Sequence, residues 1–103
     1  MERKYFVSVD SAAEDRMMGH LAFVDNVSEA AGDRLYIEYM DSLGFLSRAP
    51  ESCPLYILSE QPEEVLRYKL FGKRYRIVFR IEGTNVYVHD IQDCREDVDK
   101  SLV

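Results

Sequence analysis

Between Tyr75 and Ile81 apolar and polar side chains alternate with a period of two, which is typical of a β-strand with one buried face. The odd-numbered residues of this stretch are aromatic or aliphatic, whereas Arg76 and Arg80 stand at even-numbered positions. Glu82 to Asn85 supplies turn-forming residues, and the stretch from Val86 to Ile91 is apolar at alternate positions again. The pattern therefore predicts a β-hairpin.

A two-residue turn at Gly83-Thr84 would place Ile81 opposite Val86 and Phe79 opposite Val88. One side of the hairpin would then be wholly apolar and would face a core. The other side would carry five polar or basic side chains, which are Arg74, Arg76, Arg80, Tyr87 and His89.

The first half of the chain has a different period. Residues 4–9 read as a strand, and the capping-box pattern that begins at Ser11 predicts the start of a helix. A break near residues 26–28, with Ser28 as the next N-cap, separates it from a second helix that ends near Ser47. So short a link predicts an antiparallel helical hairpin. The apolar stripe of the first helix comprises Met17, Leu21, Val24 and Val27 or Ser28. That of the second comprises Ala31, Leu35 and Tyr39, with Tyr36, Met40 and Leu43 alongside. Met17, Met18 and the tyrosines of the second helix are expected in the core.

Further strands are expected at residues 55–58 and 65–71, and a short acidic helix at 95–102. The chain should therefore form a single α+β domain spanning residues 1–103. In that domain an N-terminal strand and an antiparallel two-helix hairpin precede a mainly antiparallel, twisted sheet of three or four further strands. The short C-terminal helix closes it.

Charge is distributed unevenly along the sequence. The chain has 13 Lys and Arg residues against 19 Asp and Glu residues, yet six basic residues and no acidic one lie between Arg67 and Ile81. A local positive patch on a chain of net charge −6 needs a functional explanation. Of all residues 47% are apolar, but no apolar run reaches the length of a membrane span. No signal segment follows Met1, so we expect a cytoplasmic protein.

The residues give no reason to expect a cofactor or a metal. Cys53, Cys94, His20 and His89 are the thiols and imidazoles of the chain, and no two of them have the close spacing of zinc ligands. In a reducing compartment the two cysteines are expected to be free thiols.

Two motifs resemble the RelE/ParE toxin superfamily of bacterial toxin–antitoxin systems. They are the strand Tyr75-Arg76-Ile77-Val78-Phe79 and the terminal Arg95-Glu96-Asp97-Val98, preceded by a helix end that runs from Leu43 to Pro50. The order of the elements matches over nearly the whole chain. The resemblance implies a RelE/ParE-like fold and a small toxin that a cognate antitoxin neutralises. The target would be DNA gyrase in the ParE-like branch or the ribosome in the RelE-like branch. A membrane partner is not expected, and a homodimer is left open.

The resemblance also implies roles for single residues. Arg76 falls on the arginine that helps hold the scissile phosphate in RelE-like enzymes, and Lys69 and Lys73 lie near their lysines. At the C-terminus, however, Cys94 and Asp99 stand where those enzymes have basic and tyrosine residues. The departure favours the ParE-like branch, in which binding to gyrase needs no catalytic residue. The alternatives are a ribosome-dependent messenger RNA endoribonuclease and a repurposed homologue that binds a partner without poisoning the cell.

If the chain cuts RNA, the weak catalytic candidates are Arg76, His89 and Lys69, since His89 is the one neutral-pH acid or base expected on the basic face. Otherwise the patch binds the target or an acidic antitoxin segment. The simplest alternative is that these cations form only a solvated strand face, and that Arg95 pairs with nearby carboxylates. The expected binding residues are Arg67, Lys73, Arg74, Arg76, Arg80, Tyr87 and Arg95.

Overall fold

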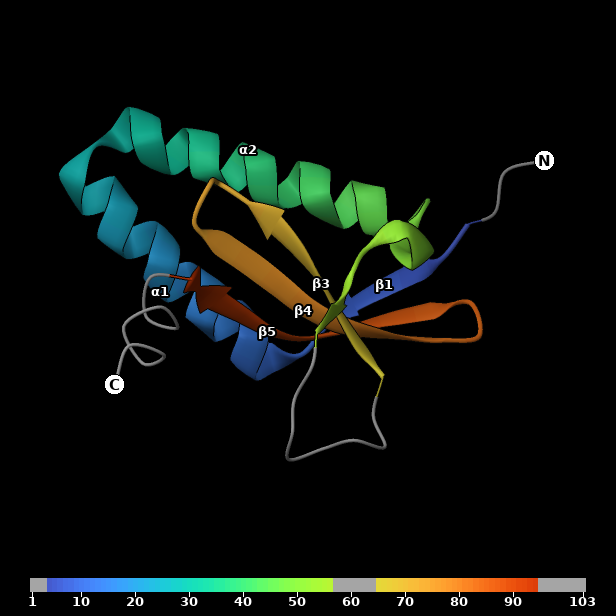
Figure 1. The fold of residues 1–103 in the computed structure, drawn as a ribbon. Helices are drawn as coiled ribbons and strands as arrows, with labels where there is room; N and C mark the ends of the chain where they lie inside the picture. Colours follow the sequence, from blue (N-terminus) through green and yellow to red (C-terminus); the bar gives the residue numbers. More distant parts are fainter. Residues whose placement is uncertain (1–3, 57–64, 95–103) are drawn as a thin grey trace.

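Two helices cover one face of a five-stranded sheet in the computed structural model, which describes residues 4–56 and 65–94 (Figure 1). The strand order is β1-β5-β4-β3-β2; β1 is parallel to β5 and every other pair is antiparallel. The elements are β1 (Phe6–Val9), α1 (Ser11–Val27), α2 (Glu29–Leu46), a 3-10 turn (Pro50–Ser52), β2 (Leu55–Tyr56), β3 (Leu66–Phe71), β4 (Tyr75–Glu82) and β5 (Asn85–Asp93). The predicted α+β class is confirmed. Residues 57–58 of the strand predicted at 55–58, and the helix predicted at 95–102, lie outside the described residues.

The helix boundaries follow capping chemistry. Ser28 caps α2, as predicted, because its hydroxyl accepts the Ala31 N–H at 3.2 Å. The expected cap of the first helix at Ser11 is wrong by one residue: the carboxylate of Asp10 accepts the Ala12 N–H at 3.2 Å, and Ser11 is already helical. Within the described ranges, no helix is long and apolar enough to cross a bilayer.

The β4–β5 hairpin has the predicted register near its turn. Ile81 pairs with Val86 and Phe79 with Val88, as the two-residue turn requires. Beyond these pairs the register shifts, because Val78 pairs with Asp90 and leaves His89 as the extra residue of a β-bulge. The bulge brings Val88 and Ile91 onto the same buried face although they are three positions apart, and both are at most 1% exposed.

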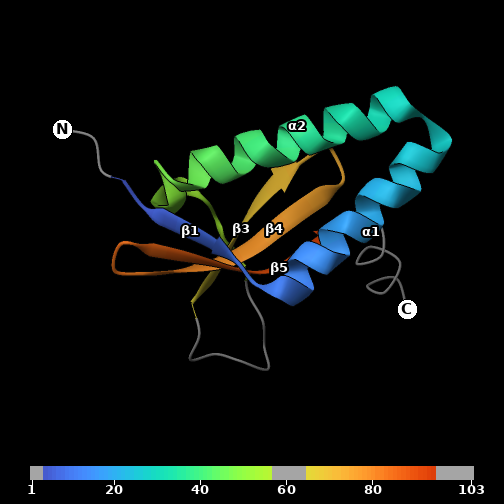
Figure 2. The ribbon, with the colours of Figure 1, turned by 180° about the vertical axis from the view of Figure 1, so that it is seen from behind.

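The core lies between the helices and the sheet. Its largest fully buried side chains include Met17 and Leu46 from the helices, and Ile77, Phe79 and Val86 from the sheet, each at most 1% exposed. Seen from behind, β1 lies beside β5, where it is paired in parallel (Figure 2). Four side chains that the sequence placed in or beside the core are instead exposed on the two helices: Met18, Val27, Tyr36 and Met40 are 58%, 78%, 49% and 46% exposed.

The turn between β3 and β4 approaches α2 closely at Gly72. Its backbone has a φ of +60°, and a Cβ at this position would lie 2.6 Å from Leu35 Cδ1. Both the backbone angle and the lack of space therefore require glycine. Gly83, in the β4–β5 turn, has nearly the same angle (φ +62°) but nothing within 4 Å of its Cβ position.

We predict that Gly72→Ala lowers the free energy of unfolding by about 2–4 kcal/mol, the sum of a left-handed alanine and an overpacked contact. Gly83→Ala is the matched control and should cost only about 1–2 kcal/mol, since it carries the backbone term alone. Urea unfolding of both variants measures the difference. Equal losses would mean that the contact with Leu35 relaxes without cost.

Tyr39 gives a second prediction, because its buried hydroxyl has no hydrogen-bond partner among the residues that the structure describes. Burial, with a smaller contribution from the negative charge of Glu14, raises its pKa above the ordinary value of 10. The folded chain therefore keeps this proton at a pH where the unfolded chain has lost it, and stability should fall as the pH rises above about 10. Tyr39→Phe should be within about 1 kcal/mol of the wild type at pH 8. Between pH 8 and pH 10.5 the free energy of unfolding of Tyr39→Phe should fall by less than that of the wild type, and urea unfolding at each pH measures both. Parallel curves for the two proteins would contradict this assignment.

Candidate functional site on the outer sheet face

Arg76 lies on the sheet face that points away from the helices, as its register opposite Leu70 and Gln92 requires. Its Nε–H donates to Gln92 Oε1 at 2.8 Å, and its guanidinium carbon lies 4.8 Å from the centroid of the Tyr56 ring. The Tyr56 hydroxyl donates to the same amide oxygen at 3.2 Å. Arg76 is therefore held in one orientation by a stacked ring and a fixed amide.

Arg80 is held in a similar way four residues, or two repeats of the pleat, further along β4. Its guanidinium carbon lies 4.6 Å from the Tyr87 ring centroid, and its Nε–H donates to His89 Nε2 at 3.1 Å. Its Nη1 also pairs with Glu82 at 2.9 Å. The Glu82 side chain is 66% exposed, so this ion pair is worth at most about 1 kcal/mol and an anionic partner could replace it.

Two of these residues, Tyr56 and Gln92, escaped the sequence analysis. Tyr56 stands on the short β2 strand, whose pairing with Leu66 places it on the outer face. Gln92 faces Arg76 only because of the bulge at His89. Without the bulge, the register of the turn would put position 92 on the face toward the helices. The alternation of side chains in the sequence therefore does not predict that Gln92 lies beside Arg76.

The structure separates two of the expected basic residues from this face. Arg67 and Lys69 pair with Phe79 and Ile77, so they lie on the side of the sheet that faces the helices. Arg67 donates to the Cys53 carbonyl at 2.7 Å, and the Lys69 ammonium lies 4.7 Å from the centroid of the Phe45 ring. Their aliphatic stems cover the border of the core while the charges reach its edge.

Lys73 and Arg74 lie in the turn that joins β3 to β4, near the end of the helical hairpin at which α1 is joined to α2. Arg74 was expected on the outer face beside Arg76. Instead its guanidinium stacks over Tyr75 at 5.2 Å and pairs with Asp93 at 3.7 Å. Tyr87 and His89 do lie with Arg80 on the outer face, as expected, whereas Arg95 lies outside the described residues.

The three weak catalytic candidates do not meet. Lys69 is on the helical side, and on the outer side Arg76 contacts Gln92 whereas His89 contacts Arg80. The His89 Nε2 that accepts the Arg80 N–H cannot take a proton from a substrate hydroxyl while that bond persists. What the face offers is two arginine forks on aromatic rings, an arrangement that suits carboxylate or phosphate groups of a macromolecule.

The remaining thiols and imidazoles are placed as structural groups. His20 lies with its Nε2 2.9 Å from the Ile91 carbonyl, and both cysteines are free. No three Asp, Glu, His or Cys residues in the described part of the chain are placed to hold a metal ion. Burial raises the pKa of the Cys53 thiol, although Lys69 and Arg67 oppose the shift, so Cys53 is a protonated thiol at neutral pH rather than a nucleophile.

We predict that Cys53 reacts slowly with the thiol reagent DTNB at pH 8, because the thiol is 6% exposed and largely protonated, whereas the half-buried Cys94 reacts faster. In Cys94→Ser only the slow reaction should remain, and in Cys53→Ser only the fast one. Absorbance of the released thiolate follows both reactions, with urea-unfolded protein as the reference. Cys94→Ser reacting at the unfolded rate would show that Cys53 is accessible.

We compared the chain with known protein families and with curated proteins. A scan against protein-family models finds no match to the chain, and a search of curated proteins finds none either. What can be inferred about function therefore comes from the residues and their geometry.

Proposed function

We propose that this chain is a toxin of the RelE/ParE superfamily, closer to the ParE-like branch, that acts in the cytoplasm of a bacterium. It arrests growth by binding a macromolecular target, with DNA gyrase favoured, and a cognate antitoxin neutralises it. The sequence motifs and the order of the elements, strand, helical hairpin and antiparallel strands, support this proposal. The observation that carries it is the pair of stacked arginines, Arg76 and Arg80, on the sheet face opposite the helices.

Binding is favoured over catalysis by the positions of the charged groups. An endoribonuclease needs a base, an acid and a cation around one phosphate. Here Lys69 lies across the sheet from Arg76, and His89 is engaged by Arg80. A protein target needs only a complementary surface, and the outer face supplies two oriented arginines with aromatic neighbours, residue types that are enriched among interface hot spots.

The distribution of charge suits an acidic antitoxin segment. The two helices carry seven carboxylates and two arginines, whereas the stretch from Leu66 to Asp93 carries six basic residues and three carboxylates. A segment rich in Asp and Glu would be attracted to the sheet and repelled by the helices, which fixes the side on which it binds.

We predict that induced expression of the wild-type chain in a bacterial host arrests growth, with cleaved plasmid DNA and intact messenger RNA. Arg76→Glu should relieve the arrest, because it reverses the charge that meets the target. Arg76→Lys keeps the charge but loses the planar fork, so its toxicity should be intermediate. Colony counts, plasmid topology and transcript integrity are the measurements.

Arg48→Glu is the matched control, since Arg48 is an exposed arginine just after α2 and away from the outer face. It should remain toxic if its thermal unfolding is close to that of the wild type. Cuts in translated RNA at codon-spaced positions would contradict gyrase as the target and indicate the ribosome instead. Absence of any growth defect would contradict the toxin proposal and favour a repurposed binding protein.

A further inference from the structure

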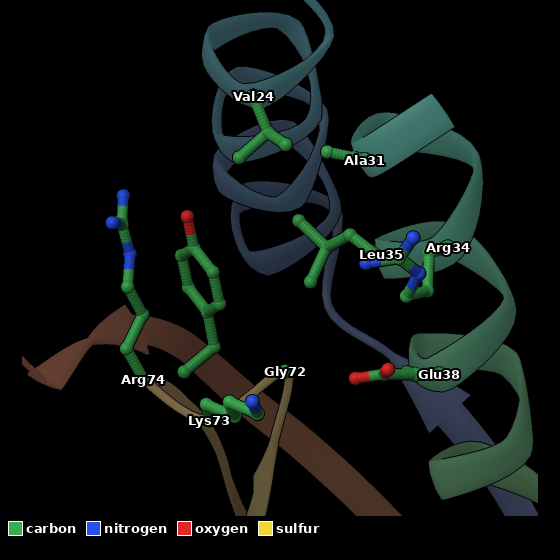
Figure 3. A pocket seen from close by; sticks show the side chains of 9 residues that line it. Val24, Ala31, Arg34, Leu35, Glu38, Gly72, Lys73 and Arg74 are labelled. Carbon is green, nitrogen blue, oxygen red and sulfur yellow. The ribbon is translucent and has the colours of Figure 1, made fainter. Parts of the chain in front are cut away.

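A small hollow lies between the end of the helical hairpin at which α1 is joined to α2 and the turn that joins β3 to β4. It has a volume of about 260 Å³. Figure 3 shows Val24 and Leu35 directed from the two helices toward the turn that carries Gly72, Lys73 and Arg74. Tyr75 completes an apolar lining. The close contact that Gly72 permits with Leu35 holds the turn against α2, so the wall of the hollow is part of the packed structure.

Three cations surround this hollow. Arg34 comes from α2, and Lys73 and Arg74 come from the turn. Within the described residues no ion pair or hydrogen bond involves the side chain of Arg34 or Lys73. Arg74 has one long ion pair, 3.7 Å to Asp93, and its buried Nε has no hydrogen-bond partner. The buried Nε of Arg74 is therefore an unsatisfied donor that an anionic ligand could satisfy, whereas the side chains of Arg34 and Lys73 are exposed and can turn toward such a ligand.

Glu38 is the one carboxylate among the described residues that line the hollow. Its Oε1 lies 3.6 Å from the position that a Cβ would take at Gly72, so it stands beside the turn. With three cations against one carboxylate, the described lining of the hollow has a net positive charge. Removing Glu38 should therefore strengthen the binding of an anion, whereas removing a cation should weaken it.

Lys73 adopts a strained backbone that keeps it at this rim. Its φ is +71°, a left-handed conformation that lysine rarely takes, and it is the one such non-glycine residue in the described part of the chain. Asparagine is far better tolerated in this conformation. The chain therefore carries a strained cation at a position where a relaxed neutral residue would fit, and such strain clusters at binding sites.

The size of the hollow limits its ligand. Pockets for cofactors and drug-sized ligands measure about 300–1,000 Å³, so 260 Å³ falls just below that range. The apolar floor and cationic rim match an aliphatic side chain that stands next to a carboxylate. We propose that the hollow is a docking site for one aliphatic residue of an acidic segment of a partner protein, with its neighbouring carboxylate bound by Arg34, Lys73 and Arg74.

This proposal goes beyond the proposed function and does not depend on it. The site lies at the β3–β4 turn rather than on the outer face with Arg76 and Arg80. A non-toxic chain could use it equally well, and a toxin could lack it. Loss of one proposal would leave the other standing.

The test uses N-acetyl-leucine, which combines a leucine side chain with a carboxylate, and N-acetyl-leucinamide as its neutral counterpart. Titrations of the whole ¹⁵N-labelled chain, followed by amide chemical shifts, report affinity and location. We expect the acid to shift amides around Leu35, Gly72 and Lys73 and to bind at least threefold more tightly than the amide.

Variants then test each charge. Lys73→Asn removes the ammonium and suits the left-handed backbone, so it should fold normally and bind the acid about threefold to tenfold more weakly. Glu38→Gln should bind it about twofold to fivefold more tightly. Arg48→Gln, whose arginine does not line the hollow, is the matched control and should bind as the wild type does. No binding, shifts confined to other surfaces, equal affinity for acid and amide, or unchanged affinity in both Lys73→Asn and Glu38→Gln would overturn the proposal.

Discussion

The fold depends on the burial of alternate side chains of β4 beneath the two helices. Ile77 and Phe79 are both fully buried, and burial of each stabilises the fold by about 1.5–3 kcal/mol. A slip of one residue would exchange them for Arg76 and Arg80, and an unpaired guanidinium in the core costs several kcal/mol. The register is therefore fixed by a large difference in free energy. The outward position of the two arginines follows from packing on the other side of the strand, whatever they bind.

The parts of the fold that the sequence predicted are those fixed by local periodicity. The alternation from Tyr75 to Ile81 and the cap at Ser28 each depend on neighbouring residues, and both are confirmed. The bulge at His89 depends on where Ile91 must pack, which is a tertiary constraint that no local pattern contains. The orientation of Arg67 and Lys69 was missed for a related reason. Charged residues on a strand suggest a solvated face, but long stems can lie along the edge of a core.

The residues of the candidate site that the sequence predicted are those whose place on the outer face follows from the hairpin pattern, Arg76 and Arg80 with Tyr87 and His89. Arg76 and Arg80 were found because their charges stand out against an acidic chain. Tyr56 and Gln92, which orient Arg76, come from a two-residue strand and from the far side of the bulge. Side chains that position a charge need no charge of their own, and their roles follow from strand pairing rather than from sequence. For this reason the sequence could predict that Arg76 and Arg80 lie on the outer face but not which side chains orient Arg76.

Overall composition misleads about surface recognition in this chain. The net charge of −6 would argue against an anionic partner if the charges were evenly mixed, but the stretch from Leu66 to Asp93 has six basic residues against three carboxylates, whereas the two helices have seven carboxylates against two arginines. At physiological ionic strength charges more than about 8 Å apart are largely screened, so a partner experiences the surface that it contacts rather than the average. The outer sheet face offers arginines spread along a strand, which suits an extended surface. The hollow at the β3–β4 turn offers cations around an apolar floor, which suits a single residue. The same excess of basic residues between Arg67 and Arg80 thus produces two different recognition geometries, because the turn at Gly72 directs part of it toward the helices and the pleat of β4 directs the rest away from them.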